Sequence, residues 1–348
     1  MLEKYLEDLE RRLAPDIEEA LLAEWQRFTN GEFRGEIFSP RRLRAAPAAI
    51  AWPEVCVNDA LDDFKSMALQ QFAACSAALA ESSGKLLAVR CNYGTGIMPS
   101  LFGAELFIME RAANTLPTTK PLPGGVAAIE ALLARGVPEV AHGLGGKVFA
   151  MGQYFADILQ PYPNLKRYVH LYHPDTQGPL DICELLWGST LFLDLIDHPE
   201  MVKALLELIT ATYMRFMDAW ARIAPFAQEN NVHWSLLHKG QLMLRDDSAM
   251  NLSAKMFAEF VQPYDQRLLD RFGGGAIHFC GKGSHYIHHL AEMRGVHAIQ
   301  MSQPEYNDLA AIFAHTIDCG RQLLDFPRNA AEQALRQGRD LRGHVHCW

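Results

Sequence analysis

Short apolar runs alternate with amphipathic stretches over the last hundred residues of the chain. Runs of this length predict buried strands, and the stretches between them carry apolar residues at helical spacing. Strands that alternate with helices through short loops are typical of a parallel sheet. The predicted strands cover 275–280, 297–301, 321–326 and 341–347, and the predicted helices cover 252–272, 284–294, 305–317 and 329–337.

The upstream part follows the same pattern less regularly. Predicted strands cover 85–91, 167–173 and 232–238, with a weak one within 97–107, and predicted helices cover 59–81, 125–135, 179–187 and 199–223. No GxGxxG turn follows the first of these strands, so eight parallel strands closed into a barrel are favoured over an open nucleotide-binding sheet. We therefore predict an α/β fold, a (β/α)₈ TIM barrel at 56–348, with an N-terminal helical extension at 1–55.

Composition narrows the class of protein. The 348 residues suit a single barrel, and a hydrophobic content of 49% is enough for a large core. The net charge of −9 argues against nucleic acid as a partner, and the absence of a long apolar run argues against a membrane partner. The chain starts with an amphipathic helical pattern rather than a signal peptide, which predicts a cytoplasmic protein. Seven cysteines without a CxxC pair are expected to be free thiols or metal ligands.

The segment GGGAIHFCG carries the strongest chemical signal. His278 and Cys280 stand two residues apart on a predicted strand, so both side chains point to the same side. Imidazole and thiolate are ligands that suit zinc. The alternative is a buried cysteine beside a histidine that fills a hydrogen bond. The chain ends in a second cluster, His344, His346 and Cys347, which would meet the first at the mouth of a common barrel.

The third ligand is the open question within this predicted zinc site. We expect Cys347, but alternation along a strand puts it on the side opposite His344 and His346, so it would need a bulge to take part. His346 is the substitute ligand. Two cysteines and one histidine would leave the fourth tetrahedral position open, as in catalytic zinc sites.

Other polar residues follow predicted strands, where barrel enzymes keep their active sites. Asp246 and Asp247 are candidate catalytic residues that would bind a cation or orient a substrate, and the alternative is a cap on the next helix. Candidate substrate-binding residues are Asn92, Tyr93 and Glu105, in a loop with several glycines, and His238, for which a core position is the alternative.

Two blocks of the chain resemble the uroporphyrinogen decarboxylase superfamily. The first is TQGPLDICELLWGSTLFLDLIDHPEMVKALLELIT, from Thr176 to Thr210, and the second is RDDSAMNLSAKMFAEFVQPYDQRLLDRFGGGAIHFCG, from Arg245 to Gly281. The resemblance extends over about residues 55–347 and implies the (β/α)₈ barrel. The RQAGRY motif of the true decarboxylases, whose arginines bind substrate carboxylates, is absent, because the arginines at 34, 41, 42 and 44 lack its spacing.

The His-x-Cys pattern resembles the branch of zinc-dependent methyltransferases such as methylcobamide:coenzyme M methyltransferase. This resemblance implies zinc on His278, Cys280 and Cys347, a small-molecule thiol as substrate, and a corrinoid, free or on a partner protein, as methyl donor. It also implies pairing into a homodimer. We therefore expect a zinc-dependent methyltransferase that activates a thiol. The alternatives are a cofactor-free tetrapyrrole decarboxylase and a non-catalytic corrinoid- or metal-binding component of a methyltransferase system.

Overall fold

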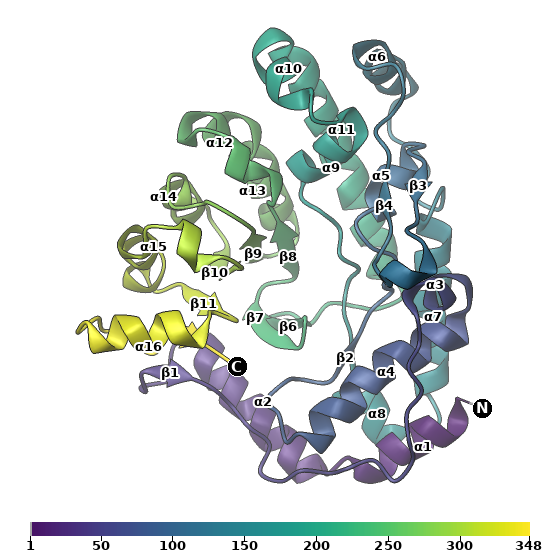
Figure 1. Cartoon of the computed structure of the whole chain (residues 1–348), viewed down its shortest axis with the longest axis vertical. Coiled ribbons are helices and arrows are strands. Elements are labelled where there is room, and N and C mark those ends of the chain that lie inside the picture. Colours follow the sequence, from purple (N-terminus) through teal and green to yellow (C-terminus); the bar gives the residue numbers. More distant parts are fainter. Residues whose placement is uncertain (1) are drawn as a thin grey trace.

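The computed structural model describes residues 2–348, and its largest sheet is parallel and six-stranded (Figure 1). The order across it is β1-β12-β11-β10-β9-β8, so the strands from β8 to β12 are neighbours in the order in which the chain makes them. Parallel neighbours need a crossover connection, which here contains a helix each time. The strands are β1 (Ile37–Phe38), β8 (Leu242–Arg245), β9 (Gly275–Phe279), β10 (Val296–Met301), β11 (Gln322–Leu324) and β12 (Val345–His346).

The helices that connect these strands lie on the outer side of the sheet (Figure 1). The alternation of strands and helices predicted for the last hundred residues is therefore confirmed. After β8 come η2 (Ser248–Asn251), α12 (Ala254–Phe260) and α13 (Gln262–Arg271); after β9 comes α14 (Ile287–Glu292); after β10 come η3 (Pro304–Tyr306), α15 (Leu309–His315) and η4 (Ile317–Cys319); after β11 comes α16 (Arg328–Arg336).

The helix predicted over 252–272 is divided in two. Ser253 is the N-cap of the first part, α12, because its hydroxyl accepts a hydrogen bond from the backbone N–H of Met256 at 3.2 Å. The break falls at Val261, whose backbone leaves the helical line (φ −116°, ψ −62°). Pro263 explains it, since a proline inside a helix has no N–H to donate and its ring collides with the preceding turn.

The first 220 residues are largely helical. The helices are α1 (Glu3–Arg12), α2 (Pro15–Thr29), α3 (Val57–Asp62), α4 (Phe64–Ala80), α5 (Ile97–Leu101), η1 (Arg111–Ala113), α6 (Val126–Arg135), α7 (Gly145–Leu159), α8 (Pro163–Tyr168), α9 (Pro179–Trp187), α10 (Leu191–Asp197) and α11 (Pro199–Trp220). Residues such as Phe216 and Trp220 of α11 are completely buried in the apolar core. Within residues 2–348, none of the helices combines the length and apolar character that a bilayer crossing requires.

Two further parallel strands, β2 (Ala88–Val89) and β5 (His170–Leu171), pair with each other. They lie where strands were predicted at 85–91 and 167–173. No ladder joins this pair to the six-stranded sheet within residues 2–348. The structure is thus an α/β fold with a parallel sheet, and the closed eight-stranded barrel stays a prediction.

Two of the predicted strand segments do not join the parallel sheets. The run at 232–238 forms an antiparallel hairpin of β6 (Asn230–His233) and β7 (Leu236–Lys239), which turns at Trp234 and Ser235 with positive φ angles of 48° and 64°. No glycine or asparagine marks this turn, so the run reads as one strand. The segment 97–107 begins with α5 and ends in β3 (Leu106–Phe107), which pairs antiparallel with β4 (Thr118–Thr119).

The sequence pattern also missed β1, which lies within the predicted extension 1–55. Ile37 is in register with Val345, so β1 is an edge strand of the main sheet beside β12. Trp25 of α2 covers this junction, with its ring centroid 5.1 Å from that of Phe38 and 4.7 Å from that of His346. The N-terminal segment therefore contributes to the same sheet and core as the C-terminal strand.

Candidate metal centre

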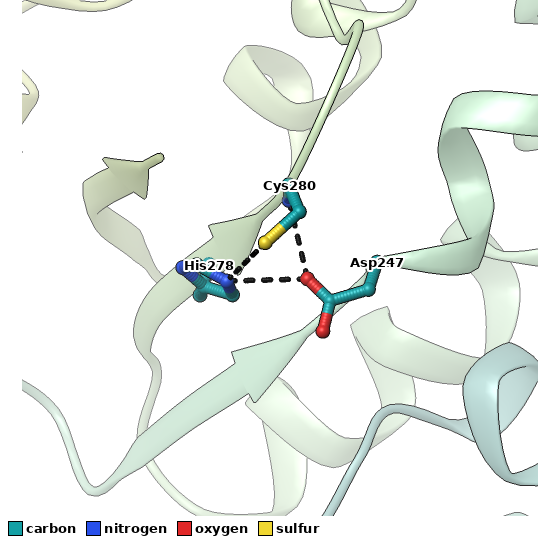
Figure 2. A group of neighbouring side chains, drawn as sticks. All are labelled: Asp247, His278 and Cys280. Carbon is teal, nitrogen blue, oxygen red and sulfur yellow. Dashed lines mark hydrogen bonds and ion pairs between the residues drawn. The ribbon is translucent and has the colours of Figure 1, made fainter. Parts of the chain in front are cut away.

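Three polar side chains meet at the carboxyl ends of β8 and β9. These strands are parallel neighbours, with Arg245 opposite His278, so the residues that follow each strand lie side by side. His278 and Cys280 point to the same side of their strand, as their spacing predicted, and Asp247 faces them from the end of β8 (Figure 2).

The donor atoms of this triad are close enough to share a cation. His278 Nε2 lies 3.1 Å from Asp247 Oδ1 and 3.2 Å from Cys280 Sγ, and the Cys280 N–H donates to the same carboxylate oxygen at 3.1 Å. Nitrogen, sulfur and oxygen ligands of a tetrahedral zinc ion stand roughly 3.4–3.6 Å apart, so a small outward adjustment would admit the ion. Among residues 2–348, this is the single group of three His, Cys, Asp or Glu side chains in such an arrangement.

The neighbouring strand orients the imidazole. Gln300 of β10 is in register with His278, and its Oε1 accepts a close hydrogen bond from His278 Nδ1. Gln300 Nε2 in turn donates to Asp325 Oδ2 at 3.4 Å. A histidine that ligates a metal commonly donates its other ring N–H to such a partner, which leaves the Nε2 lone pair for the ion. Ser302 Oγ lies 3.5 Å from Cys280 Sγ.

The electrostatics of the triad favour a positive charge at its centre. Burial opposes charge on Asp247, but the hydrogen bond and charge of His278, together with Arg245, hold the pKa of that carboxyl well below its usual range. Burial also opposes charge on His278, yet Asp247 and Cys280 raise its pKa to about 10. In the ion-free protein a proton on His278 supplies the positive charge, and a divalent cation on a neutral His278 would replace it.

The two other predicted ligands lie elsewhere, which corrects the expected ligand set. β12 is three positions from β9 in the sheet, about 14 Å at the usual strand spacing, which is too far for one ion. The Cys347 side chain is completely buried, and burial raises its pKa to about 12. His346 packs between Trp25 and Trp348, its Nδ1 accepts from the Asp325 N–H at 3.0 Å, and burial lowers its pKa to about 3. The third member of the triad is Asp247.

The two predicted catalytic carboxylates, Asp246 and Asp247, lie in different surroundings. Asp247 belongs to the triad, whereas Asp246 points away from it into a fully buried position. There Asp246 lies next to Asp265, and no donor within residues 2–348 reaches either carboxyl. Burial raises the pKa of Asp265 to about 8, so this pair holds a proton at neutral pH.

None of the predicted substrate-binding residues makes a hydrogen bond or ion pair with the triad within residues 2–348. Tyr93 is buried in the core, and Asn92 beside it is half-buried. Glu105 is exposed and pairs with Lys120 at 2.7 Å. His238 lies in β7, where its Nδ1 donates to the Lys239 carbonyl at 3.0 Å and burial lowers its pKa to about 4, which corresponds to the core alternative.

A network that the sequence did not single out lies next to the triad. The Asp175 carboxylate is bound closely by Arg90 and also by Arg245 at 3.3 Å, His233 at 3.1 Å and Trp234 at 3.1 Å. Arg245 reaches on to Asp247 Oδ2 at 3.5 Å. Asp175 stands two residues after the predicted strand at 167–173, just as Asp247 stands two residues after β8, and this position was the signal that could have revealed it.

No family model matches this chain, and no curated protein matches it. A methyltransferase from Methanosarcina mazei is similar in structure, with a TM-score of 0.62 over 94% of this chain and 92% of the methyltransferase. The two proteins share a fold. Their sequence identity is 15%, so the likeness concerns the fold alone, and the function has to be argued from the site.

Proposed function

We propose that this protein is a zinc-dependent methyltransferase in which Asp247, His278 and Cys280 hold the ion. The observation that carries the proposal is the convergence of these three donors at the carboxyl ends of two neighbouring parallel strands. The same end of the strands holds the active site in barrel enzymes. The structural similarity to a methyltransferase is consistent with this function.

The donor set fits zinc in a catalytic role. One imidazole, one thiolate and one carboxylate are ordinary zinc ligands, and three protein ligands leave the fourth position for a substrate. When bound, zinc keeps a coordinated thiol ionised at neutral pH. The residues of the chain supply the rest: Gln300 orients His278, and the Cys280 N–H holds Asp247 toward the same point.

The reaction that we propose is transfer of a methyl group to the sulfur of a small thiol. The electron pair of the thiolate forms the new carbon–sulfur bond, and the pair from the broken bond leaves with the methyl donor. As donor we propose a corrinoid, bound free or on a partner protein, or a small methylated compound, in keeping with the resemblance to the zinc-dependent methyltransferase branch.

We also propose that the two parallel sheets belong to one (β/α)₈ barrel of the uroporphyrinogen decarboxylase superfamily. Eight strands belong to the two parallel sheets, six in one and two in the other; in chain order they are β1, β2, β5, β8, β9, β10, β11 and β12. The first of them pairs with the last, which is the neighbour relation of a closed barrel. A barrel with this strand order supports the assignment of the site to its C-terminal mouth.

Metal content tests the proposal. Elemental analysis of untagged protein should find close to one zinc per chain in the wild type and far less in Cys280→Ala. Cys319→Ala is the matched control, because Cys319 is exposed and outside the triad. A folded wild type that takes up no zinc would overturn the proposal and make the tetrapyrrole decarboxylase the next activity to assay.

A further inference from the structure

A cavity of ≈ 310 Å³ opens beside the triad, and Asp247 is part of its wall. Its other polar lining residues include Thr119, Gln177, Asp181, Glu184 and Ser248; we call this space the acidic cavity. Its volume is at the lower end of the range for pockets that bind small molecules. Because Asp247 belongs both to the wall and to the triad, a ligand in the cavity would lie next to a metal-bound group.

The wall of the acidic cavity contains carboxyl groups but no basic side chain. Asp181, Glu184 and Asp247 contribute carboxyl groups, and no Lys, Arg or His is among the lining residues. Asp181 is fixed by the backbone N–H groups of Asp247 at 3.0 Å and Ser248 at 2.7 Å. Glu184 is bound by the Ser248 hydroxyl and has no basic partner within residues 2–348. Burial and the neighbouring carboxyl groups raise the pKa of Asp181, and Arg245 and His278 pair with Asp247. The negative charge that favours a cation over an anion in this cavity therefore comes from Glu184.

Two neutral oxygens in the wall also lack a donor. Gln177 is 5% exposed, and its Nε2 donates to Asp181 at 3.2 Å and to Asp247 at 3.4 Å, which leaves Oε1 without a partner. Thr119 is 7% exposed, and its Oγ1 has no partner either. A buried polar group without a partner is costly, and an amide oxygen can only accept, so Gln177 Oε1 points to a ligand that donates hydrogen bonds.

We propose that the acidic cavity binds the ammonium group of the substrate, which is therefore an aminothiol. The inference rests on the proposed function, because the sulfur of that substrate would take the open zinc position beside Asp247. A protonated amine brings one positive charge and several N–H donors, and these match the carboxyl groups of Asp181 and Glu184 and the free oxygen of Gln177. A thiol with a carboxylate or sulfonate would meet like charge in the same place.

The first experiment is independent of zinc. Propylamine, propanol and propionate are titrated into the protein as purified, and binding is followed by calorimetry. Propylamine is expected to bind in preference to the other two, and Glu184→Gln should weaken it about tenfold, the effect of losing one charged hydrogen bond. Glu130→Gln, on the exposed side of α6, is the matched control and should bind propylamine like the wild type. Equal binding of the three probes, or unchanged affinity in Glu184→Gln, would refute the cavity assignment even if zinc is present.

The second experiment uses the zinc-loaded protein and three thiols of similar size: cysteamine, 2-mercaptoethanol and 3-mercaptopropionate. Cysteamine should bind most tightly, and Glu184→Gln should remove its advantage over 2-mercaptoethanol while zinc content stays the same. A preference for 3-mercaptopropionate would overturn the aminothiol assignment. If the protein takes up no zinc, the proposed function fails, but selective binding of propylamine would still support the cavity as an ammonium site.

Discussion

Replacing Asp247 with asparagine tests whether the third zinc ligand is Asp247, as the structure indicates, or Cys347, as the sequence predicted. Asparagine keeps the size of the side chain and an oxygen that can accept from Cys280 N–H and His278, so the fold should be retained. The change removes an anionic ligand that lies 3.1 Å from His278 Nε2. Cys347→Ala is the matched comparison, because Cys347 is buried about three strands away from β9.

The magnitude follows from the energetics of zinc sites. Four-ligand structural sites bind zinc with about 10–16 kcal/mol, which is roughly 3 kcal/mol for each ligand. Loss of one ligand therefore weakens binding about 100-fold. Cys347→Ala leaves all three donors in place, and its cost of about 1 kcal/mol falls on folding stability, since it only removes a small buried group.

Competition with a chromophoric chelator at pH 7.5 measures both affinities, and urea unfolding of the zinc-free proteins measures both stabilities. We expect Asp247→Asn to bind zinc more weakly while its free energy of unfolding changes little. We expect Cys347→Ala to bind zinc like the wild type while its free energy of unfolding falls. If Asp247→Asn binds zinc like the wild type while Cys347→Ala does not, the triad is not the metal site.

Three further predictions concern the pH dependence of stability through His278, the orientation of His278 by Gln300, and the backbone conformation at Gly240. The zinc-free protein should lose stability as the pH rises from 6.5 to 10, because the raised pKa of His278 stabilises the fold only while the ring is protonated. The increase in this pKa on folding corresponds to at most about 5 kcal/mol of unfolding free energy. In urea unfolding, His278→Gln should show a flatter dependence of stability on pH. Gln300→Leu should lower zinc affinity about 10- to 100-fold in the chelator assay, with unchanged affinity counting against its orienting role. Gly240→Ala should lower the thermal midpoint clearly, because φ is +80° and a Cβ would lie 2.2 Å from the Gly274 carbonyl carbon; a midpoint within 1 °C or so of wild type would contradict this.

The sequence was most informative where the determinants are local. The spacing of His278 and Cys280 predicted that both side chains share one side, because alternation in a strand depends on the backbone alone. Asp247 was a candidate catalytic residue because it follows an apolar run, which is also a local feature of the sequence. The turn at Trp234 was missed, because the hairpin is stabilised by its surroundings and carries none of the usual turn residues.

By itself, the sequence determined the strand–helix alternation of the C-terminal part and two of the three candidate ligands, since both depend on residues close together in the chain. Only the tertiary structure decided the third. Asp247 joins the triad because β8 is the neighbour of β9, whereas Cys347 is excluded because β12 pairs with β11 and β1. The order of strands in a sheet is set by packing between residues far apart in the sequence, and no local pattern along one chain records it.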